Sequence, residues 1–459
     1  MRLRLPHTFV LLFALTAMAA ALTWAIPAGE YARREVSGRR VVDPTSYHRV
    51  AAEPAGPLDV LQAWPRGLEA TASIVFYLFL VGGAFGVVQA TGALEAGIEA
   101  LVRAAGARGA RVIPLLVALF SLGGGTIGLA EEVLAFLPAL VLLVRRLGYD
   151  DLLAGVIGLA GAGAGFAGAF LNPFTVGVGQ AIAGLPLFSG MGYRLVVWSV
   201  LTAVTMAWIA RAARRLRLPD DAATAGGAAP AAPASAAPDL GVGAPLSWRH
   251  AAVLLALLAT VALLVAGALA WGWGLLELSA LFVATGVVAG LAGGLGANRT
   301  AESFVAGAAG FAGAALVVGL ARGVLVVLDG ARVTDTILHA LVETVRELPA
   351  SLTVTGVYAV QVALSYVVPS GSGQAALSLP ILVPLGDVVG VTRQTSVLAY
   401  QLGDGFSNVF TPTQGYFMAG LAMIGVSWPR WVRFLWPLQA IWLVLGLALL
   451  LVAHAIGWS

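Results

Sequence analysis

Charge is scarce in this sequence, and two residue types are missing from it. Charged residues make up 11% of the 459 positions, whereas soluble domains carry about a quarter. Cysteine is absent, which excludes disulfide bonds and thiolate metal sites. Lysine is absent as well, so all 26 basic residues are arginine, and the formal net charge is only +3. A charge this small does not indicate a nucleic-acid partner.

Long apolar stretches fill most of the chain instead. Hydrophobic residues occupy 59% of the positions, and a membrane-spanning helix needs about 20 of them in succession. The length therefore allows roughly ten to twelve spans with their loops. The first apolar run, at about 8–26, follows two arginines and is interpreted as an uncleaved span with a cytoplasmic N-terminus. The sequence thus predicts an all-α polytopic protein of the cytoplasmic (inner) membrane, surrounded by the lipid bilayer.

Two halves with the same order of parts flank a segment of low complexity. Residues 218–246 are rich in alanine, proline and glycine and are predicted to be a flexible cytoplasmic linker. The halves, 1–217 and 247–459, each contain scaffold helices, a surface arm, a glycine-interrupted hairpin, a proline-interrupted helix and a closing helix. The corresponding parts are hairpins at about 111–146 and 351–389 and broken helices at about 151–187 and 392–424.

The positions of arginine predict how the halves are oriented. Arginines flank both ends of the first hairpin, and a further cluster follows the closing helix of the first half. Because basic residues collect on the cytoplasmic side of a membrane, the first hairpin is expected to be re-entrant and to open to the cytoplasm. When membrane crossings are counted from a cytoplasmic N-terminus, the second hairpin is expected to open to the outside. The halves are therefore predicted to be inverted repeats, an arrangement typical of secondary transporters with a site near the midplane.

Each hairpin and broken helix is interrupted by residues that suit an unwound backbone. Glycine-rich stretches at 121–126 and 369–374 interrupt the hairpins, and the helices break at Asn172-Pro173 and between 404 and 412. Hydrocarbon does not tolerate unpaired backbone groups, so these interruptions must be buried in protein or face a water-filled cavity. Helix N-termini at such places favour anions, and unwound carbonyl groups favour cations. The polar residues beside the interruptions are therefore candidates for binding.

The candidates divide into two groups by their chemistry. Small and neutral polar residues are expected to bind a solute, although hydroxyls at helix ends also serve as simple caps. Acidic residues in apolar segments cost roughly 2.5–3.5 kcal/mol on insertion scales, so they are expected to be functional, with one active member in the paired glutamates. The predicted solute-binding residues are Gly124, Gly125, Thr126, Asn172, Thr175, Ser370, Gly371, Ser372, Gly373, Gln374, Thr411 and Thr413. The predicted ion-coupling residues are Glu131, Glu132, Asp404, Ser407 and Asn408.

Three motifs at the interruptions are distinctive. They read Asn-Pro-Phe-Thr-Val-Gly at 172–177, Pro-Ser-Gly-Ser-Gly-Gln at 369–374 and Gly-Asp-Gly-Phe-Ser-Asn at 403–408. Together with the opening segment at 6–31, they resemble the YfcC branch of the C4-dicarboxylate anaerobic carrier (DcuC-like) family. The resemblance covers nearly the whole chain outside the linker.

This resemblance implies membership of the ion transporter superfamily. Such proteins are expected to be homodimers in which a scaffold domain holds a transport domain that moves like an elevator. The hairpins and broken helices would form the transport domain, with site residues at the hairpin tips and helix interruptions. The branches of the family are associated with dicarboxylates, basic amino acids and peptides, so the resemblance leaves the solute open.

The sequence thus favours a secondary active transporter for a small carboxylate or an amino acid, driven by Na⁺ or H⁺ or by exchange. A Na⁺/H⁺ antiporter is one alternative, because it also uses broken helices and buried carboxylates. A non-transport membrane subunit of a complex is another, although it would need no inverted repeat with gaps at depth. An enzyme is not predicted, since the sequence shows neither a nucleophile–base pair nor a metal-ligand set. No cofactor is expected besides the coupling ion.

Overall fold

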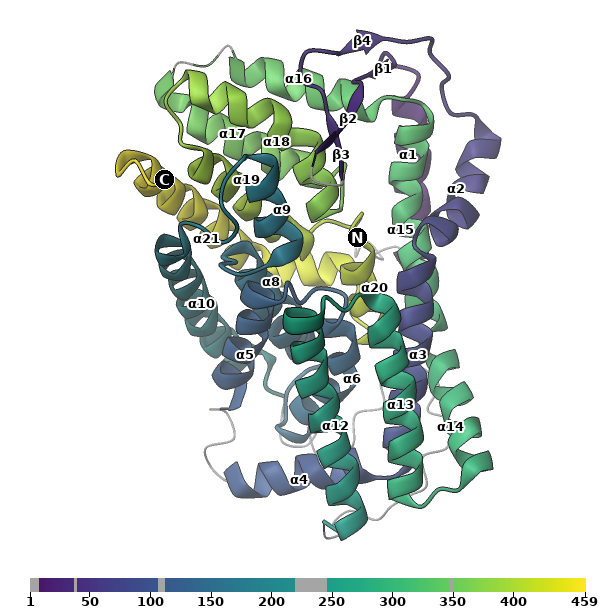
Figure 1. Cartoon of the computed structure of the whole chain (residues 1–459). Helices are drawn as coiled ribbons and strands as arrows, with labels where there is room; N and C mark the ends of the chain where they lie inside the picture. Colours follow the sequence, from purple (N-terminus) through teal and green to yellow (C-terminus); the bar gives the residue numbers. More distant parts are fainter. Residues whose placement is uncertain (1–7, 37–38, 106–111, 219–245, 347, 349) are drawn as a thin grey trace.

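Helices make up most of the computed structural model, which describes residues 8–36, 39–105, 112–218, 246–346, 348 and 350–459 (Figure 1). Nearly all of the predicted linker, 218–246, lies outside these residues. Five helices of the described part are long and apolar enough to cross a membrane, judged by length and composition: Ala72–Ala90, Met191–Leu216, Leu275–Gly293, Ala297–Gly330 and Trp428–Ala455. The helical and apolar architecture agrees with the predicted polytopic membrane protein.

The first half contains four short strands among its helices. The strands pair as two antiparallel ribbons, β1 with β4 and β2 with β3. Three of its helical segments depart from α-helical geometry, η2 and η3 being π-helical and η4 a 3-10 helix. The elements are α1 (Thr8–Leu22), β1 (Gly29–Glu30), β2 (Arg33–Val36), β3 (Arg39–Val42), β4 (His48–Arg49), α2 (Pro57–Ala70), α3 (Ala72–Ala90), α4 (Ala93–Ala105), α5 (Val112–Thr126), α6 (Val133–Arg146), α7 (Leu152–Gly155), η2 (Val156–Ala160), α8 (Gly161–Ala167), η3 (Pro173–Gly177), α9 (Val178–Ile182), α10 (Met191–Ala213) and η4 (Arg214–Leu216).

The second half is helical throughout its described part. One segment, η5, continues α12 as a π-helix. The elements are α12 (Trp248–Ala266), η5 (Gly267–Trp271), α13 (Leu275–Gly293), α14 (Ala297–Gly310), α15 (Ala312–Gly330), α16 (Thr334–Arg346), α17 (Ala350–Ser365), α18 (Gly371–Val388), α19 (Arg393–Asn408), α20 (Gly415–Met423) and α21 (Trp428–Ala455).

The first hairpin consists of α5 and α6, and it is interrupted at 127–132. The predicted interruption at 121–126 is wrong, because these residues form the last turns of α5. Gly124, Gly125 and Thr126 therefore belong to a helix and not to an unwound hairpin tip.

Gly124 of α5 and Gly165 of α8 serve the packing of these two helices against each other. A Cβ at Gly124 would collide with the carbonyl oxygen of Ala162, and a Cβ at Gly165 would collide with that of Ser121. The missing side chains let the two helices cross in close contact, as small residues commonly do between membrane helices. Glycine has two uses here, a flexible turn or a close approach, and the neighbouring helix selects the second.

The second hairpin consists of α17 and α18 and is interrupted at 366–370. Ser370 caps α18, since its Oγ accepts a hydrogen bond from the backbone amide of Gly373 at 3.3 Å. The predicted interruption at 369–374 is correct for its first two residues. The remainder is wrong, because it forms the first turn of α18.

The first broken helix resumes at the predicted position, but its interruption begins earlier than predicted. The rod formed by α7, η2 and α8 ends at Ala167, and helical structure resumes at Pro173. The side-chain oxygen of Asn172 accepts hydrogen bonds from the amides of Phe174 at 2.9 Å and Thr175 at 3.3 Å. An asparagine cap followed by proline at the first helical position defines a helix start within a few residues.

The second broken helix unwinds later than predicted. α19 continues to Asn408, and the chain is unwound at 409–414 before α20 begins. Asp404 therefore lies inside a helix, and the predicted start of the interruption near it is wrong. The glycines beside it again serve close packing, since a Cβ at Gly405 would overlap Ala167 of α8.

Contacts between elements repeat from one half to the other. α5 packs on α8 and α17 packs on α19, while α8 and α19 pack on each other. The second helix of each hairpin contacts the broken helix of the other half, since α6 contacts α20 and α18 contacts α9. The surface arms also correspond, α4 contacting α6 and α16 contacting α18. A duplicated unit would produce this agreement, while the opposite orientation of the halves stays a prediction.

Two groups of helices can be distinguished by these contacts. The central group comprises the hairpins and broken helices, α5 to α9 and α17 to α20, and its core is α8 and α19, in which every residue except Arg393 is buried. The scaffold group comprises α2, α3 and α12 to α15, which pack on one another (Figure 1). The groups touch where α15 contacts α20 and where α3 contacts α6.

Candidate functional site

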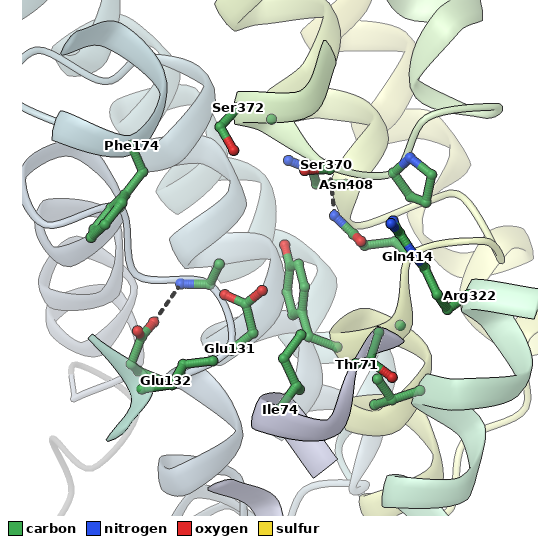
Figure 2. A pocket seen from close by; sticks show the side chains of 18 of the residues that line it. Thr71, Ile74, Glu131, Glu132, Phe174, Arg322, Ser370, Ser372, Asn408 and Gln414 are labelled. Carbon is green, nitrogen blue, oxygen red and sulfur yellow. Dashed lines mark hydrogen bonds between the residues drawn. The ribbon is translucent and has the colours of Figure 1, made fainter. Parts of the chain in front are cut away.

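A cavity of about 390 Å³ lies between the central group and the scaffold group (Figure 2). Residues at both hairpin interruptions and at the second helix interruption line it, together with Phe174 and Thr175 at the start of η3. The opposite wall comes from the α2–α3 junction, from α15 and from the turn before α13. Segments that are far apart in the sequence therefore meet around one space.

The first turn of α18 presents its backbone to this cavity. Ser370, Gly371 and Ser372 all line it. The first amide groups of a helix have no acceptor within the helix, and they carry the positive end of the helix dipole. An anionic group such as a carboxylate would be stabilised there.

Two acidic side chains line the wall formed by the first hairpin interruption. Glu132 accepts a hydrogen bond from the amide of Ala130 at 3.1 Å. Glu131 points toward the open space in Figure 2. Neither glutamate forms an ion pair with a basic side chain in the part of the chain that the structure describes. This wall would attract a cationic group such as an ammonium.

Arg322 lines the other side of the cavity, on α15 of the scaffold group (Figure 2). It is the one basic side chain among the described lining residues, and its Nε is buried without a hydrogen-bond partner there. A guanidinium offers a planar fork of donors that matches a carboxylate. Arg322 is absent from the residues predicted above, although an arginine in the middle of an apolar helix is a signal of function.

Part of the predicted set lies at the cavity. The predicted residues that line it are Glu131, Glu132, Thr175, Ser370, Gly371, Ser372, Asn408 and Thr413. Lining residues outside the predicted set include Thr71, Phe174 and Tyr416. Thr71 comes from the scaffold group, where no interruption pointed to it.

The other predicted residues do not line the cavity, and two of them form structural hydrogen bonds. Gln374 bonds to Gln361 and Ser365, which joins the two arms of the second hairpin. Ser407 donates to the carbonyl oxygen of Gly403, one turn earlier in α19. The remaining predicted residues that do not line the cavity are Gly124, Gly125, Thr126, Asn172, Gly373, Asp404 and Thr411.

Asp404 lies behind the cavity wall and is connected to it. Its side chain is buried, and Oδ2 accepts a hydrogen bond from Nδ2 of Asn408 at 3.1 Å. Oδ1 of Asn408 accepts in turn from Nε2 of Gln414 at 2.8 Å (Figure 2). Asn408 and Gln414 both line the cavity, so this relay joins the buried carboxylate to the open space.

One protein family and two curated proteins are similar to this chain over nearly its whole length. The model of the C4-dicarboxylate anaerobic carrier family, DcuC, matches residues 5–455. A protein of Escherichia coli (strain K12) named "Putative basic amino acid antiporter YfcC" is 31% identical over 505 aligned positions, covering 100% of this chain and 98% of the relative. A protein of Haemophilus influenzae with the name "Uncharacterized protein" is 29% identical, covering 97% and 96%.

Two solved structures also align with the chain over most of its length. The Alcanivorax borkumensis YdaH transporter has 16% sequence identity and a TM-score of 0.44, with 99% of each chain covered. Neisseria gonorrhoeae MtrF, of a class of antimetabolite efflux pumps, has 16% identity and a TM-score of 0.41, with 98% and 95% covered.

Proposed function

This chain belongs to the C4-dicarboxylate anaerobic carrier (DcuC) family, and on that premise we propose that it is a secondary active transporter of a basic or zwitterionic amino acid in the cytoplasmic membrane. The observation that carries the proposal is the cavity between the two groups of helices, which has acidic side chains on one wall and Arg322 on another. Its volume of about 390 Å³ lies within the range of pockets that hold small molecules.

The distribution of charge around the cavity supports an amino acid over a dicarboxylate. Arg322 and the first turn of α18 are suited to a carboxylate, and Glu131 and Glu132 are suited to an ammonium or guanidinium group. A second carboxylate on the solute would face the glutamates and be repelled. The name of the Escherichia coli relative, which refers to basic amino acids, agrees with this choice.

The position of the cavity supports movement of one group of helices against the other. In our proposal, the central group is the transport domain and the scaffold group is static, with the halves related as inverted repeats. Solute would bind at the contact between the groups, because Thr71 and Arg322 come from the scaffold group and Ser370 from the central group. The protein would act as a homodimer, by exchange or with a coupling cation.

Counterflow into proteoliposomes tests the proposed function. Liposomes containing the full-length protein and unlabelled L-arginine should accumulate external radiolabelled L-arginine. Liposomes loaded with unlabelled succinate should not accumulate external radiolabelled succinate. Glu131→Gln should lower the apparent affinity for L-arginine about tenfold or more, because it removes a charged partner. The matched control is Glu343→Gln, which removes the same charge from an exposed ion pair on α16.

Two results would count against this proposal. Accumulation of succinate but not of L-arginine would return the solute to the dicarboxylates. Proton movement driven by a Na⁺ gradient, with no transport of any amino acid or dicarboxylate, would favour the Na⁺/H⁺ antiporter instead.

A further inference from the structure

Asp404 is a buried acid that has no positively charged partner among the residues that the structure describes. Its side chain is 0% exposed, and Oδ1 has no hydrogen-bond partner among the same residues. Only the amide of Asn408 donates to Oδ2 among the hydrogen bonds of the described residues. A carboxylate in such a place is stable only if a proton or another cation neutralises it. The acid is therefore available for a cation that comes from outside the protein.

Thr175, at the start of η3, approaches the same glycine as this acid. Its hydroxyl is buried and has no hydrogen-bond partner among the described residues. A Cβ placed on Gly371 would lie 3.0 Å from Oδ2 of Asp404 and 2.7 Å from the methyl carbon of Thr175. Three segments, from both broken helices and the second hairpin, thus converge at one point. Oxygen ligands from unwound segments and half-helix ends are what Na⁺ sites in transporters use.

The titratable groups around this point are acidic or phenolic. Tyr400 donates its hydroxyl to the carbonyl oxygen of Gly371 at 2.7 Å, and Tyr416 lies within electrostatic range of Asp404. Glu131 and Glu132, from the first hairpin, lie within electrostatic range of the same tyrosine, Tyr416. No basic side chain in the described part of the chain pairs with Asp404, so none competes with an incoming cation.

From this geometry we infer that Asp404 and Thr175 form a coupling-cation site, for Na⁺ or a proton, which lies beside the solute cavity and shares Thr175 with its wall. The inference rests on the proposed transport function and states how the cation acts on the solute. Gly371 lies at the N-terminus of α18, where the carboxylate of the solute is proposed to bind. Asp404 lies directly behind Gly371. An ionised Asp404 repels that carboxylate, and a bound cation removes the repulsion.

The site therefore links two binding events with a defined sign. Cation binding raises the affinity for the solute, and the solute raises the affinity for the cation by the same factor, because coupling is reciprocal. The relay from Asp404 through Asn408 to Gln414 gives a second path between the same two places. A neutral residue at position 404 would imitate the cation-bound state.

Ligand-induced thermal stabilisation of the purified full-length protein tests the inference. The melting temperature is measured with NaCl and with choline chloride, from acidic to alkaline pH, with and without L-arginine. If Na⁺ is the cation, NaCl alone should raise the melting temperature of the unmodified protein and should lower the half-saturating concentration of L-arginine. If the proton is the cation, acidic pH should lower the half-saturating concentration of L-arginine. NaCl should then change neither this concentration nor the melting temperature.

Asp404→Asn should still bind L-arginine but lose its dependence on Na⁺ and on pH. A merely structural role for Asp404 would not separate binding from its cation dependence in this way. The matched control, Asp387→Asn, removes an aspartate from an exposed ion pair on α18 and should keep the full dependence. If Asp404→Asn shows the same Na⁺ and pH dependence as the unmodified protein, the inference is overturned.

Thr175→Val keeps the test decisive if Asp404→Asn does not fold. Loss of one supporting group typically weakens a cation site by about tenfold, so the concentration of Na⁺ or of protons at half effect should rise by about that factor. An unchanged midpoint would contradict the inference. Failure of the proposed function looks different, because L-arginine would then stabilise no variant, while the response to NaCl or to pH alone would still report on Asp404.

Discussion

Arg322 is held in place by glycines that precede and follow it in α15. A Cβ at Gly319 would collide with Leu68, and one at Gly323 would lie 3.0 Å from the carbonyl oxygen of Ala63. Both contacts are with α2, so α15 lies close against that helix along the turn that carries the arginine. The guanidinium therefore reaches the cavity from a rigid backbone, as a binding site requires.

Replacement of Arg322 tests whether it binds the carboxylate of the solute. Arg322→Gln should weaken competition by L-arginine by roughly tenfold or more, since a hydrogen-bonded charged partner is worth about 1.5–3 kcal/mol. Competition by agmatine, which lacks the carboxylate, should change little. Inhibition of counterflow by the two compounds measures this difference, and Arg346→Gln in an exposed pair is the control. Equal loss for both compounds would show that Arg322 does not read the carboxylate.

At the scale of elements, the crossing of α5 and α8 explains why the first hairpin is interrupted later than its glycines suggest. The backbones approach at Gly124 and Gly165, where side chains are excluded. Helix continues through Gly124 because α8 packs directly against it, which outweighs the low helix propensity of glycine. The chain unwinds only after this contact ends, at 127–132.

A single methyl group at this crossing should destabilise the protein without reaching the cavity. Gly124→Ala places a Cβ against the backbone of α8 and should cost about 1–3 kcal/mol, as overpacking does. Thermal unfolding in detergent measures the loss. Gly192→Ala is the control, because a Cβ at that helical position meets nothing within 4 Å. Unchanged stability together with weaker solute binding would instead support the role predicted for Gly124 from the sequence.

At the scale of the whole molecule, the loop after α1 joins the two halves. The amide of Tyr31 donates to Asp335 of α16 at 2.9 Å, and Arg33 forms an ion pair with the same carboxylate at 2.8 Å. Tyr47 stacks on His339 with ring centroids 3.9 Å apart. Strand β3 also contacts α18. This outer contact connects the first half to the second hairpin.

Removal of Asp335 should loosen this outer contact. Asp335→Ala leaves the amide of Tyr31 without an acceptor, and an unsatisfied buried donor costs about 1–3 kcal/mol. The melting temperature should fall accordingly. Glu53→Ala is the control, because Glu53 is well exposed and its pair with Arg332 is long at 3.8 Å, so it should contribute little. Equal melting temperatures for the two variants would show that the outer contact adds nothing to stability.

Local chemistry by itself determined the class of this protein and the start of two of its helical segments. An apolar chain with few charges must satisfy its backbone within helices in a membrane, so composition is sufficient to predict the architecture. Asn172 and Pro173 start a helix because the cap and the restricted φ angle act within a few residues. The motif around Ser370 marks the second hairpin for the same reason. In each case the interacting groups are neighbours in the chain.

Only the tertiary structure decided how the glycines and the charged residues are used. Gly124 and Gly405 suit either an unwound turn or a close contact, and the position of α8 decides between them. Arg322 and Asp404 are both charged residues in helices, yet one lines the cavity and the other lies behind its wall. Their positions depend on how α15 and α19 pack against other helices. A cavity arises from distances between segments far apart in the chain, and no local pattern of residues contains those distances.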